Sequence, residues 1–573
     1  MTILRSTYCL VGVLTALILL TLVAADIEQV DISSVRTESL DRTIERVAAA
    51  SPGAVRAFPD DLSQWERERE DIRQALDRSL GVSRIYEEAP LDVRIFEPRK
   101  LPGDSTVRPL LFDAEPGMAV SALLFEPPAP PPLPAVILFA GHTGRGKASR
   151  EYALLVAELL SRGIAVLAVD EIGGGERAFT GQQMPELLRF GVTPGGVQVR
   201  DGKRAIDLLS TVPTIDAHRI GAVGHSGGGF QTFYLAALDE RIAAAVAIKY
   251  VSSYLGMIRS GIEHTLDNYL LYPLRTFEQR HVLAAIAPRP FMVISSRDDI
   301  FPAHEASLTV SEAAHIYGLY GAEENLVFHV FPGGHDLARD EMKAAADFLA
   351  HRLGGTVPAF EAMTLVNAVK KAMSLQVAIP QEKQGTLADI AARLRRRGMF
   401  SPLPITPETD ADLSSLVVAD RLDGGGMRRQ EVAIGRSGRF LFRVEMLFSS
   451  ADRITKALLL VNPSRRDRRV CEQEVREGCV CLLMRLRNGS TERPLWPRFD
   501  YEEYRSWGNA LLAGYSLDFF KESDIVLAQR YLVERFALSP AAVTSLVPES
   551  LLTESKYRLY GALTAARDTP SAF

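Results

Sequence analysis

The chain has 573 residues, of which 47% are hydrophobic and 24% are charged, and its formal net charge is -6 at pH 7. This composition is typical of a globular protein with two or more domains. The acidic balance and the lack of a basic block argue against a nucleic-acid partner.

The first 25 residues have the pattern of a signal peptide. An apolar run covers residues 8–23, and small residues follow it directly before Asp26. An uncleaved membrane anchor is the alternative, because the run approaches the lower length limit for crossing a bilayer. We expect cleavage after residue 25, a secreted or periplasmic mature chain, and no membrane attachment after cleavage.

Residues 26–60 are predicted to be a polar lead-in. Leu62 to Leu80 carries an apolar stripe at helical spacing, which predicts an amphipathic helix that covers a core. Met118 to Phe125 alternates like a β-strand, and the proline-rich segment 127–134 then predicts a stiff connector. Residues 135–139 are continuously apolar, as expected for a strand buried on both faces.

The next loop, residues 141–147, fits two different functions. It matches the Gly-x-x-x-x-Gly-Lys pattern of a phosphate-binding loop, and the acidic strand end at Asp170 resembles a second feature of NTPases. A phosphate-binding loop needs Ser or Thr after its Lys to bind magnesium, whereas residue 148 is Ala, so nucleotide binding is disfavoured. The alternative is a loop in which the backbone amide of His142 binds a developing oxyanion.

The most informative motif is Gly-His-Ser-Gly-Gly at residues 224–228, between a strand-like apolar run and a helix-forming segment. In this context Gly-x-Ser-x-Gly is a nucleophile elbow, with Ser226 as the nucleophile. The turn is so tight that its neighbours must be small, and the amide of Gly227 can face the oxyanion. A glycine-rich turn with an incidental serine is the alternative unless partner residues follow.

Two later strands lead to the partners that a nucleophilic serine requires. Residues 289–296 predict a buried strand that leads to Asp298 and Asp299, and residues 326–331 predict one that leads to His335. The order Ser, Asp, His is that of the α/β-hydrolase fold, in which these residues follow the carboxyl ends of strands. We expect His335 to be the general base and Asp298 to orient it. Asp299 is the alternative; Asp298 is preferred because it has the Asp-x-x-(Val/Phe)-Pro spacing of related hydrolases.

These motifs resemble the acetyl xylan esterase and cephalosporin deacetylase-like group of α/β-hydrolases, and the related dienelactone-hydrolase-like esterases. The resemblance covers residues 60–355, and its matching pieces are Gly141-His142, the run from Asp216 into the serine elbow, Leu-Asp-Glu-Arg-Ile at 238–242, Ala-Pro-Arg-Pro at 287–290 and Phe-Pro-Gly-Gly-His at 331–335. His225 departs from the pattern, because the xylan esterases often carry Gln there. The resemblance implies hydrolysis of acyl esters, with acetyl groups on glycans as candidate substrates and with no cofactor or metal.

Two other functions use the same residues differently. A prolyl-oligopeptidase-like serine peptidase has the same triad, but such enzymes normally carry a propeller, and the sequence has no blade-length repeat. An exported binding or scaffold protein with a decayed site would keep the fold and have an unreactive Ser226.

The sequence divides into an α/β-hydrolase catalytic domain at 61–355, a linker region at 356–385 and a C-terminal α/β domain at 386–573. The mature chain keeps three cysteines, Cys471, Cys479 and Cys481. Their odd number and apolar setting favour a role as small buried hydrophobic side chains.

The C-terminal domain weakly repeats the first one. Residues 456–463 echo 134–141, and residues 478–484 echo 163–169. A further register without gaps aligns Val543 with Ile220 and places Glu549 where Ser226 stands. We therefore predict a truncated, catalytically inactive second α/β-hydrolase half.

Overall fold

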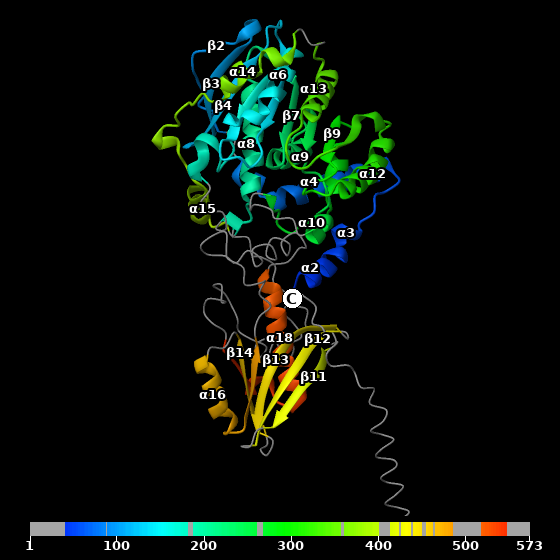
Figure 1. Ribbon diagram of the computed structural model, residues 1–573, viewed down its shortest axis with the longest axis vertical. Helices are drawn as coiled ribbons and strands as arrows, with labels where there is room; N and C mark the ends of the chain where they lie inside the picture. The colour runs from blue at the N-terminus through cyan, green and yellow to red at the C-terminus, as the bar shows by residue number, and fades with distance from the viewer. Residues whose placement is uncertain are drawn as a thin grey trace, which may run out of the picture. The chain divides into compact units, whose positions relative to one another are not determined.

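The computed structural model describes residues 40–86, 89–180, 187–188, 190–260, 268–356, 360–399, 413–422, 426–436, 439–449, 454–461, 465–484 and 517–546. The described residues form a larger unit, residues 43–399, which holds the predicted catalytic residues and is called the catalytic unit, and a second unit whose elements lie between 413 and 546 (Figure 1). The predicted signal peptide and Glu549 lie outside the described residues. Within the described part of the chain, no helix combines the length and apolar character needed to cross a membrane.

A mixed, mostly parallel sheet forms the centre of the catalytic unit. Its strand order is β1-β3-β4-β6-β5-β7-β8-β9-β10, with β2 also paired to β3. Strands β5 to β10 run parallel to one another, and β4 joins them antiparallel to β6. The strands are β1 (Arg94–Ile95), β2 (Arg99–Lys100), β3 (Thr106–Glu115), β4 (Met118–Glu126), β5 (Leu133–Phe139), β6 (Ala165–Val169), β7 (Ile215–His225), β8 (Ile242–Ile248), β9 (Phe291–Ser296) and β10 (Leu326–Phe331).

Helices cover both faces of this sheet, which explains why its central strands are apolar throughout. Leu138 shares a core cluster with α6, α13 and α14, whereas the neighbouring Phe139 lies on the opposite face, near Leu235 of α9. Figure 1 shows the helices arranged around the sheet. Helices α4, α8, α9 and α11 pack against one another. The helices are α2 (Leu40–Ala49), α3 (Pro52–Val55), α4 (Leu62–Leu80), α5 (Val82–Ile85), α6 (Ala153–Ser161), α8 (Pro194–Leu209), α9 (Gly227–Leu238), α10 (Tyr254–Ser260), α11 (Gln279–Ile286), α12 (Ala303–Leu319), α13 (Arg339–Leu353), α14 (Val366–Met373) and α15 (Leu387–Arg396).

The predicted domain boundary at residue 355 is wrong, because two further helices belong to the catalytic unit. Helix α14 packs on α6, so residues 356–385 are not simply a linker. Helix α15 buries Leu387, Ile390, Ala391 and Leu394 in a cluster with residues of the catalytic unit. Its Arg393 also donates to both carboxylate oxygens of Glu115, at 2.7 and 2.6 Å.

The second unit contains a six-stranded sheet with the order β11-β12-β13-β15-β14-β16. Strands β11 to β13 form an antiparallel meander, β13 is antiparallel to β15, and β14 is parallel to both β15 and β16. Its elements are β11 (Leu413–Leu422), β12 (Met427–Arg436), β13 (Arg439–Ser449), β14 (Lys456–Val461), α16 (Arg465–Val475), β15 (Cys479–Met484), α18 (Leu517–Phe536) and β16 (Val543–Leu546). As predicted, all three thiols are buried, in an apolar cluster.

The predicted internal repeat agrees with the strand order, direction and register of the two sheets. The path β12-β13-β15-β14-β16 follows the same order and directions as β3-β4-β6-β5-β7. In the first sheet, Ala135 of β5 pairs with Ala165 of β6 on one side and with Ile220 of β7 on the other. In the second sheet, Ala457 of β14 pairs in the same way with Val480 of β15 and Val543 of β16. These are the residues that the sequence repeat aligns.

Candidate active site

The serine elbow lies between β7 and α9, and its backbone is strained. Ser226 has φ 56° and ψ -118°, a conformation that residues other than glycine rarely adopt and that is typical of functional sites. A Cβ atom added to Gly224 would lie 2.1 Å from the carbonyl oxygen of Gly228, and one on Gly228 would lie 2.1 Å from that of Phe139. The elbow therefore requires the small residues that the motif predicts.

His335 connects Ser226 to a carboxylate. Its Nε2 lies 2.8 Å from Ser226 Oγ, and its Nδ1 lies 3.1 Å from each carboxylate oxygen of Asp299. The side chain of Asp299 is 1% exposed, whereas that of His335 is 31% exposed. The three side chains thus form a continuous line from a buried acid, through an imidazole, to a hydroxyl at a strained turn.

The prediction that Asp298 orients His335 is wrong, since Asp299 occupies that position. The backbone amide of Asp298 donates to Gly333 O at 2.9 Å, which holds the turn against the histidine loop, while the residue itself is exposed. The side chain of Asp299 turns inward, and its Oδ1 also accepts from the amide of Phe301 at 2.8 Å. The Asp-x-x-Phe-Pro spacing located the correct turn, but it does not determine which of two adjacent carboxylates faces inward.

The loop after β5 lies beside the elbow, as the oxyanion prediction requires. A Cβ atom added to Gly141 would lie 3.2 Å from Ser226 Cβ, and one on Gly227 would lie 2.6 Å from Cε1 of His142. The imidazole of His142 therefore rests on Gly227, the first residue of α9. The structure brings together Ser226, His335, His142 and Gly227, the predicted site residues other than Asp298.

Lys147, the lysine of the phosphate-loop pattern, is already paired with protein carboxylates. Its ammonium forms an ion pair with Asp170 and another with Glu176 at 2.6 Å, and it donates to Ser121 Oγ at 3.1 Å. Its side chain is 2% exposed. Two carboxylates at this position would repel a phosphate, so the loop is shaped by an internal ion cluster and does not present a phosphate-binding lysine.

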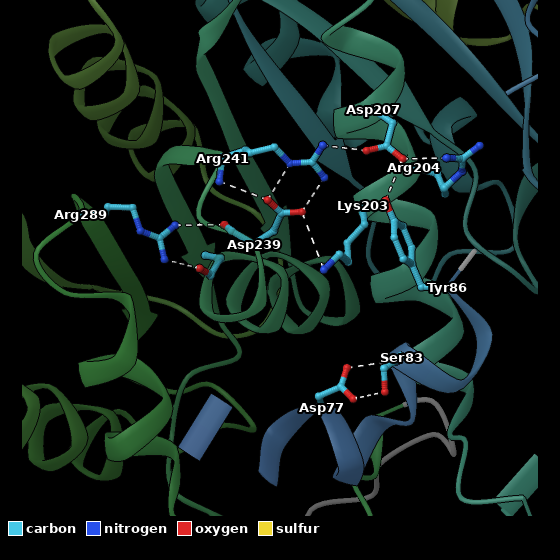
Figure 2. A network of polar contacts seen from close by, with 10 residues as sticks. Asp77, Ser83, Tyr86, Lys203, Arg204, Asp207, Asp239, Arg241 and Arg289 are labelled. Atoms are coloured by element: carbon cyan, nitrogen blue, oxygen red, sulfur yellow. Dashed lines mark hydrogen bonds and ion pairs between the residues drawn. The ribbon is translucent and has the colours of Figure 1, made fainter. Parts of the chain in front are cut away.

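The motif at 238–242 lies at the other end of α9, where its first four residues line a shallow cavity of about 660 Å³, and the motif at 287–290 contacts the same helix end through Arg289. Figure 2 shows Asp239 bonded to Arg241. Arg289 donates to the carbonyl oxygens of Ala236 and Ile242 at 2.6 and 2.8 Å. Arg241 also reaches Asp207 of α8 at 2.7 Å. Helix α9 has 12 residues, so this network lies about 18 Å from Ser226 at the usual rise of a helix. These motif residues connect α9 to its neighbours and take no part in the site.

Comparison with known proteins finds relatives of one part of this chain. The dienelactone hydrolase family model matches residues 120–349. The protein named "Putative hydrolase YtaP" of Bacillus subtilis (strain 168) is 28% identical over 208 residues, which are 34% of this chain and 70% of that protein. Dipeptidyl-peptidase 5 of Porphyromonas gingivalis is 46% identical over 54 residues, 9% of this chain and 8% of the peptidase.

The fold is also similar to that of a solved structure. Methylesterase BT1017 aligns with a TM-score of 0.50 and 22% identity, over 63% of this chain and 80% of that chain. The catalytic sheet therefore has the α/β-hydrolase architecture expected from the sequence. Residues 120–349 of this chain thus match the dienelactone hydrolase family model, and part of the chain is similar to a protein named as a hydrolase.

Proposed function

We propose that the chain is a serine-type carboxylic ester hydrolase in which Ser226 is the nucleophile. The observation that supports this most directly is the line from Ser226 Oγ through His335 to Asp299, with contacts of 2.8 and 3.1 Å. His335 Nε2 takes the hydroxyl proton as Oγ adds to the ester carbonyl, and Asp299 keeps the other imidazole proton on Nδ1. His335 then returns the proton to the leaving alcohol, and water hydrolyses the acyl-enzyme by the same route in reverse.

The backbone amides of Gly227 and His142 are proposed to stabilise the tetrahedral oxyanion. Two features support this: Gly227 begins a helix, whose free amides carry positive partial charge, and the His142 loop lies against the elbow. The buried ion cluster around Lys147 supports the role by fixing the same loop.

The proposed substrates are acyl esters of carbohydrates, foremost acetyl esters, and the proposed location is outside the cytoplasm. The substrate class rests on the resemblance of the motifs to acetyl xylan esterase-like enzymes. Export rests on the pattern of residues 1–25. Peptide hydrolysis is the second candidate, because a short segment matches a dipeptidyl-peptidase.

Labelling with a fluorophosphonate followed by intact-mass analysis tests the nucleophile. We expect one label per chain, and none in Ser226→Ala. Release of acetate from acetylated sugars and cleavage of short peptides are then measured side by side. Acetate release without peptide cleavage supports the esterase, the reverse supports the peptidase, and a folded protein that takes no label contradicts both.

A further inference from the structure

The loop that carries His335 needs support from outside itself. None of the residues 332–336 is buried, and Gly333 has φ 106°. Apolar packing therefore contributes little to holding this loop, although catalysis by His335 depends on its position within a fraction of an ångström. Other contacts must fix the imidazole between Ser226 and Asp299.

Three consecutive carbonyl groups of this loop accept hydrogen bonds from two buried side chains. The ammonium of Lys249 donates to the carbonyl oxygens of Gly334 and Asp336, at 2.8 and 2.5 Å. Nε2 of His225 donates to the carbonyl oxygen of His335 at 2.8 Å. We refer to Lys249 and His225 together as the carbonyl clamp; Lys249 is 1% exposed and His225 is 7% exposed.

Lys249 has a strained backbone and a buried ion-pair partner. It directly follows β8 with φ 54°, in the left-handed region that lysine rarely occupies. Its Nζ lies 2.9 Å from Oε1 of Glu341, whose side chain is 0% exposed. Glu341 also accepts from Ser296 Oγ at 2.6 Å and from the amide of Ala338 at 2.8 Å. The pair thus ties the ends of β8 and β9 to the start of α13.

The donors of Lys249 match these acceptors in number. An ammonium has three N–H groups, and the three acceptors here are two loop carbonyls and one carboxylate. Glu341 also neutralises the charge, which a buried lysine requires. The sequence alone gives no other reason to place a charged pair under an exposed loop, since an apolar pair would fill the same space more cheaply.

His225 completes the clamp as a neutral imidazole. Burial lowers its pKa to about 4, and since a carbonyl oxygen can only accept, the proton of the ring must be on Nε2. Nδ1 faces the hydroxyl of Tyr152 at 3.5 Å, and this hydroxyl accepts from the amide of Gly141 at 2.6 Å. The clamp therefore connects the histidine loop to the loop proposed to bind the oxyanion.

We propose that Lys249, neutralised by Glu341, is a positioning residue that holds His335 in line between Ser226 and Asp299. The inference rests on the proposed role of His335 as the general base. A displacement of about 1 Å in a catalytic group can lower a rate about 100-fold. Loss of the clamp should therefore lower kcat while leaving substrate affinity nearly unchanged, because Lys249 is buried and its three donors face acceptors of the protein itself.

The test uses a double variant, Lys249→Met with Glu341→Gln, so that no unpaired charge is left buried. The matched control is Lys383→Met with Asp113→Asn. Lys383 and Asp113 form a similar pair at 2.9 Å, with side chains 9% and 8% exposed. Asp113 lies on β3, four strands from β7, which is about 19 Å at the usual strand spacing. The control variant therefore loses a buried ion pair that lies far from the candidate active site.

We expect kcat for a soluble acetate ester to fall about 10- to 100-fold in the clamp variant, with KM within about threefold of wild type. In the control variant, kcat should stay within about twofold of wild type, even if its melting temperature falls as far as that of the clamp variant. A clamp variant with kcat within twofold of wild type, or a control with an equal loss of kcat, would overturn the proposal.

Two further measurements keep the proposal testable. If the double variant does not fold, Lys249→Arg keeps the charge beside Glu341, but its planar guanidinium does not match the three acceptors, and we expect about a tenfold lower kcat. Wild-type kcat in this variant rejects the clamp. If the wild-type protein neither hydrolyses esters nor takes a label, the proposed function fails. Amide exchange of residues 333–338 then still tests the clamp, since it should accelerate in the double variant and stay unchanged in the control.

Discussion

Replacing Asp299 by Asn changes one hydrogen-bond donor without changing the shape of the site. Oδ1 of Asp299 accepts from the amide of Phe301 at 2.8 Å, so the oxygen of the new amide should stay there and its NH₂ should face His335. The NH₂ group replaces Oδ2, 3.1 Å from Nδ1 of His335, and can only donate, which favours Nδ1 as an acceptor and moves the ring proton to Nε2. Nε2 then donates toward Ser226 and can no longer take its proton.

The expected loss in kcat is about 10⁴-fold, the size seen when the orienting acid of such a triad becomes an amide. At 1.36 kcal/mol per tenfold, this corresponds to about 5 kcal/mol in the barrier. Asp298→Asn is the matched control, because Asp298 is the exposed neighbour and the described residues offer its carboxylate no hydrogen bond. We expect its kcat to stay within about twofold of wild type. Hydrolysis of an acetate ester and the rate of fluorophosphonate labelling measure both variants.

The activities of the two variants show which of the two carboxylates faces His335 in solution. A large loss in Asp298→Asn with a nearly normal Asp299→Asn would show that the turn adopts the other arrangement in solution. Full activity in both would show that His335 needs no carboxylate, and the proposed mechanism would fail. Circular dichroism of both variants should match wild type, because an amide replaces a carboxylate of the same shape.

Three further predictions concern the fold around the site. Gly228→Ala should give no folded enzyme, because the new methyl group would lie 2.1 Å from the carbonyl oxygen of Phe139; soluble, labelled protein would contradict this. Burial lowers the pKa of His281 to about 3, below its ordinary value in the unfolded chain. The stability that the neutral, buried imidazole gives to the fold is therefore fully present above about pH 6.5 and is lost as the pH falls. From pH 6.5 to 5 this amounts to about 2 kcal/mol, and urea unfolding at pH 7 and pH 5 should show a smaller loss in His281→Gln than in wild type. A chain that ends at residue 405 should have a higher melting temperature than one that ends at 385, because the shorter one lacks α15 and exposes its apolar cluster; equal values would show that α15 adds no stability.

Periodicity and strand composition were sufficient to locate the main elements. The predicted helix at Leu62–Leu80 and the strand at Leu326–Phe331 have the observed bounds. The helix succeeds because its stripe is buried on one side, with an Asp61 cap and Gly81 at its end. The repeat between the two sheets was also visible in the sequence, because buried parallel strands tolerate few residue types and keep their spacing.

The remaining errors concern contacts between residues far apart in the chain. Local spacing favoured Asp298, but the choice between the two acids depends on Gly333, which binds the turn from another strand end. The boundary was predicted too early, at residue 355, because α15 is amphipathic and its apolar face gives no sign of which unit it covers. Lys249 and Glu341 belong to no motif and lie 92 positions apart, so only the fold brings them together.

The recurrence of one strand pattern in both sheets bears on how the protein folds. The arrangement from β3 to β7 exists a second time as β12 to β16, with its own buried core and, among the residues that the structure describes, without partners equivalent to β8, β9 and β10. We expect residues 106–225 to behave as a cooperative folding unit that gains structure before the strands that follow. During synthesis, Ser226 would then reach its strained turn while Asp299 and His335 are still to be translated. Hydrolytic competence would thus be the last property the growing chain acquires, after the nucleophile is already in place.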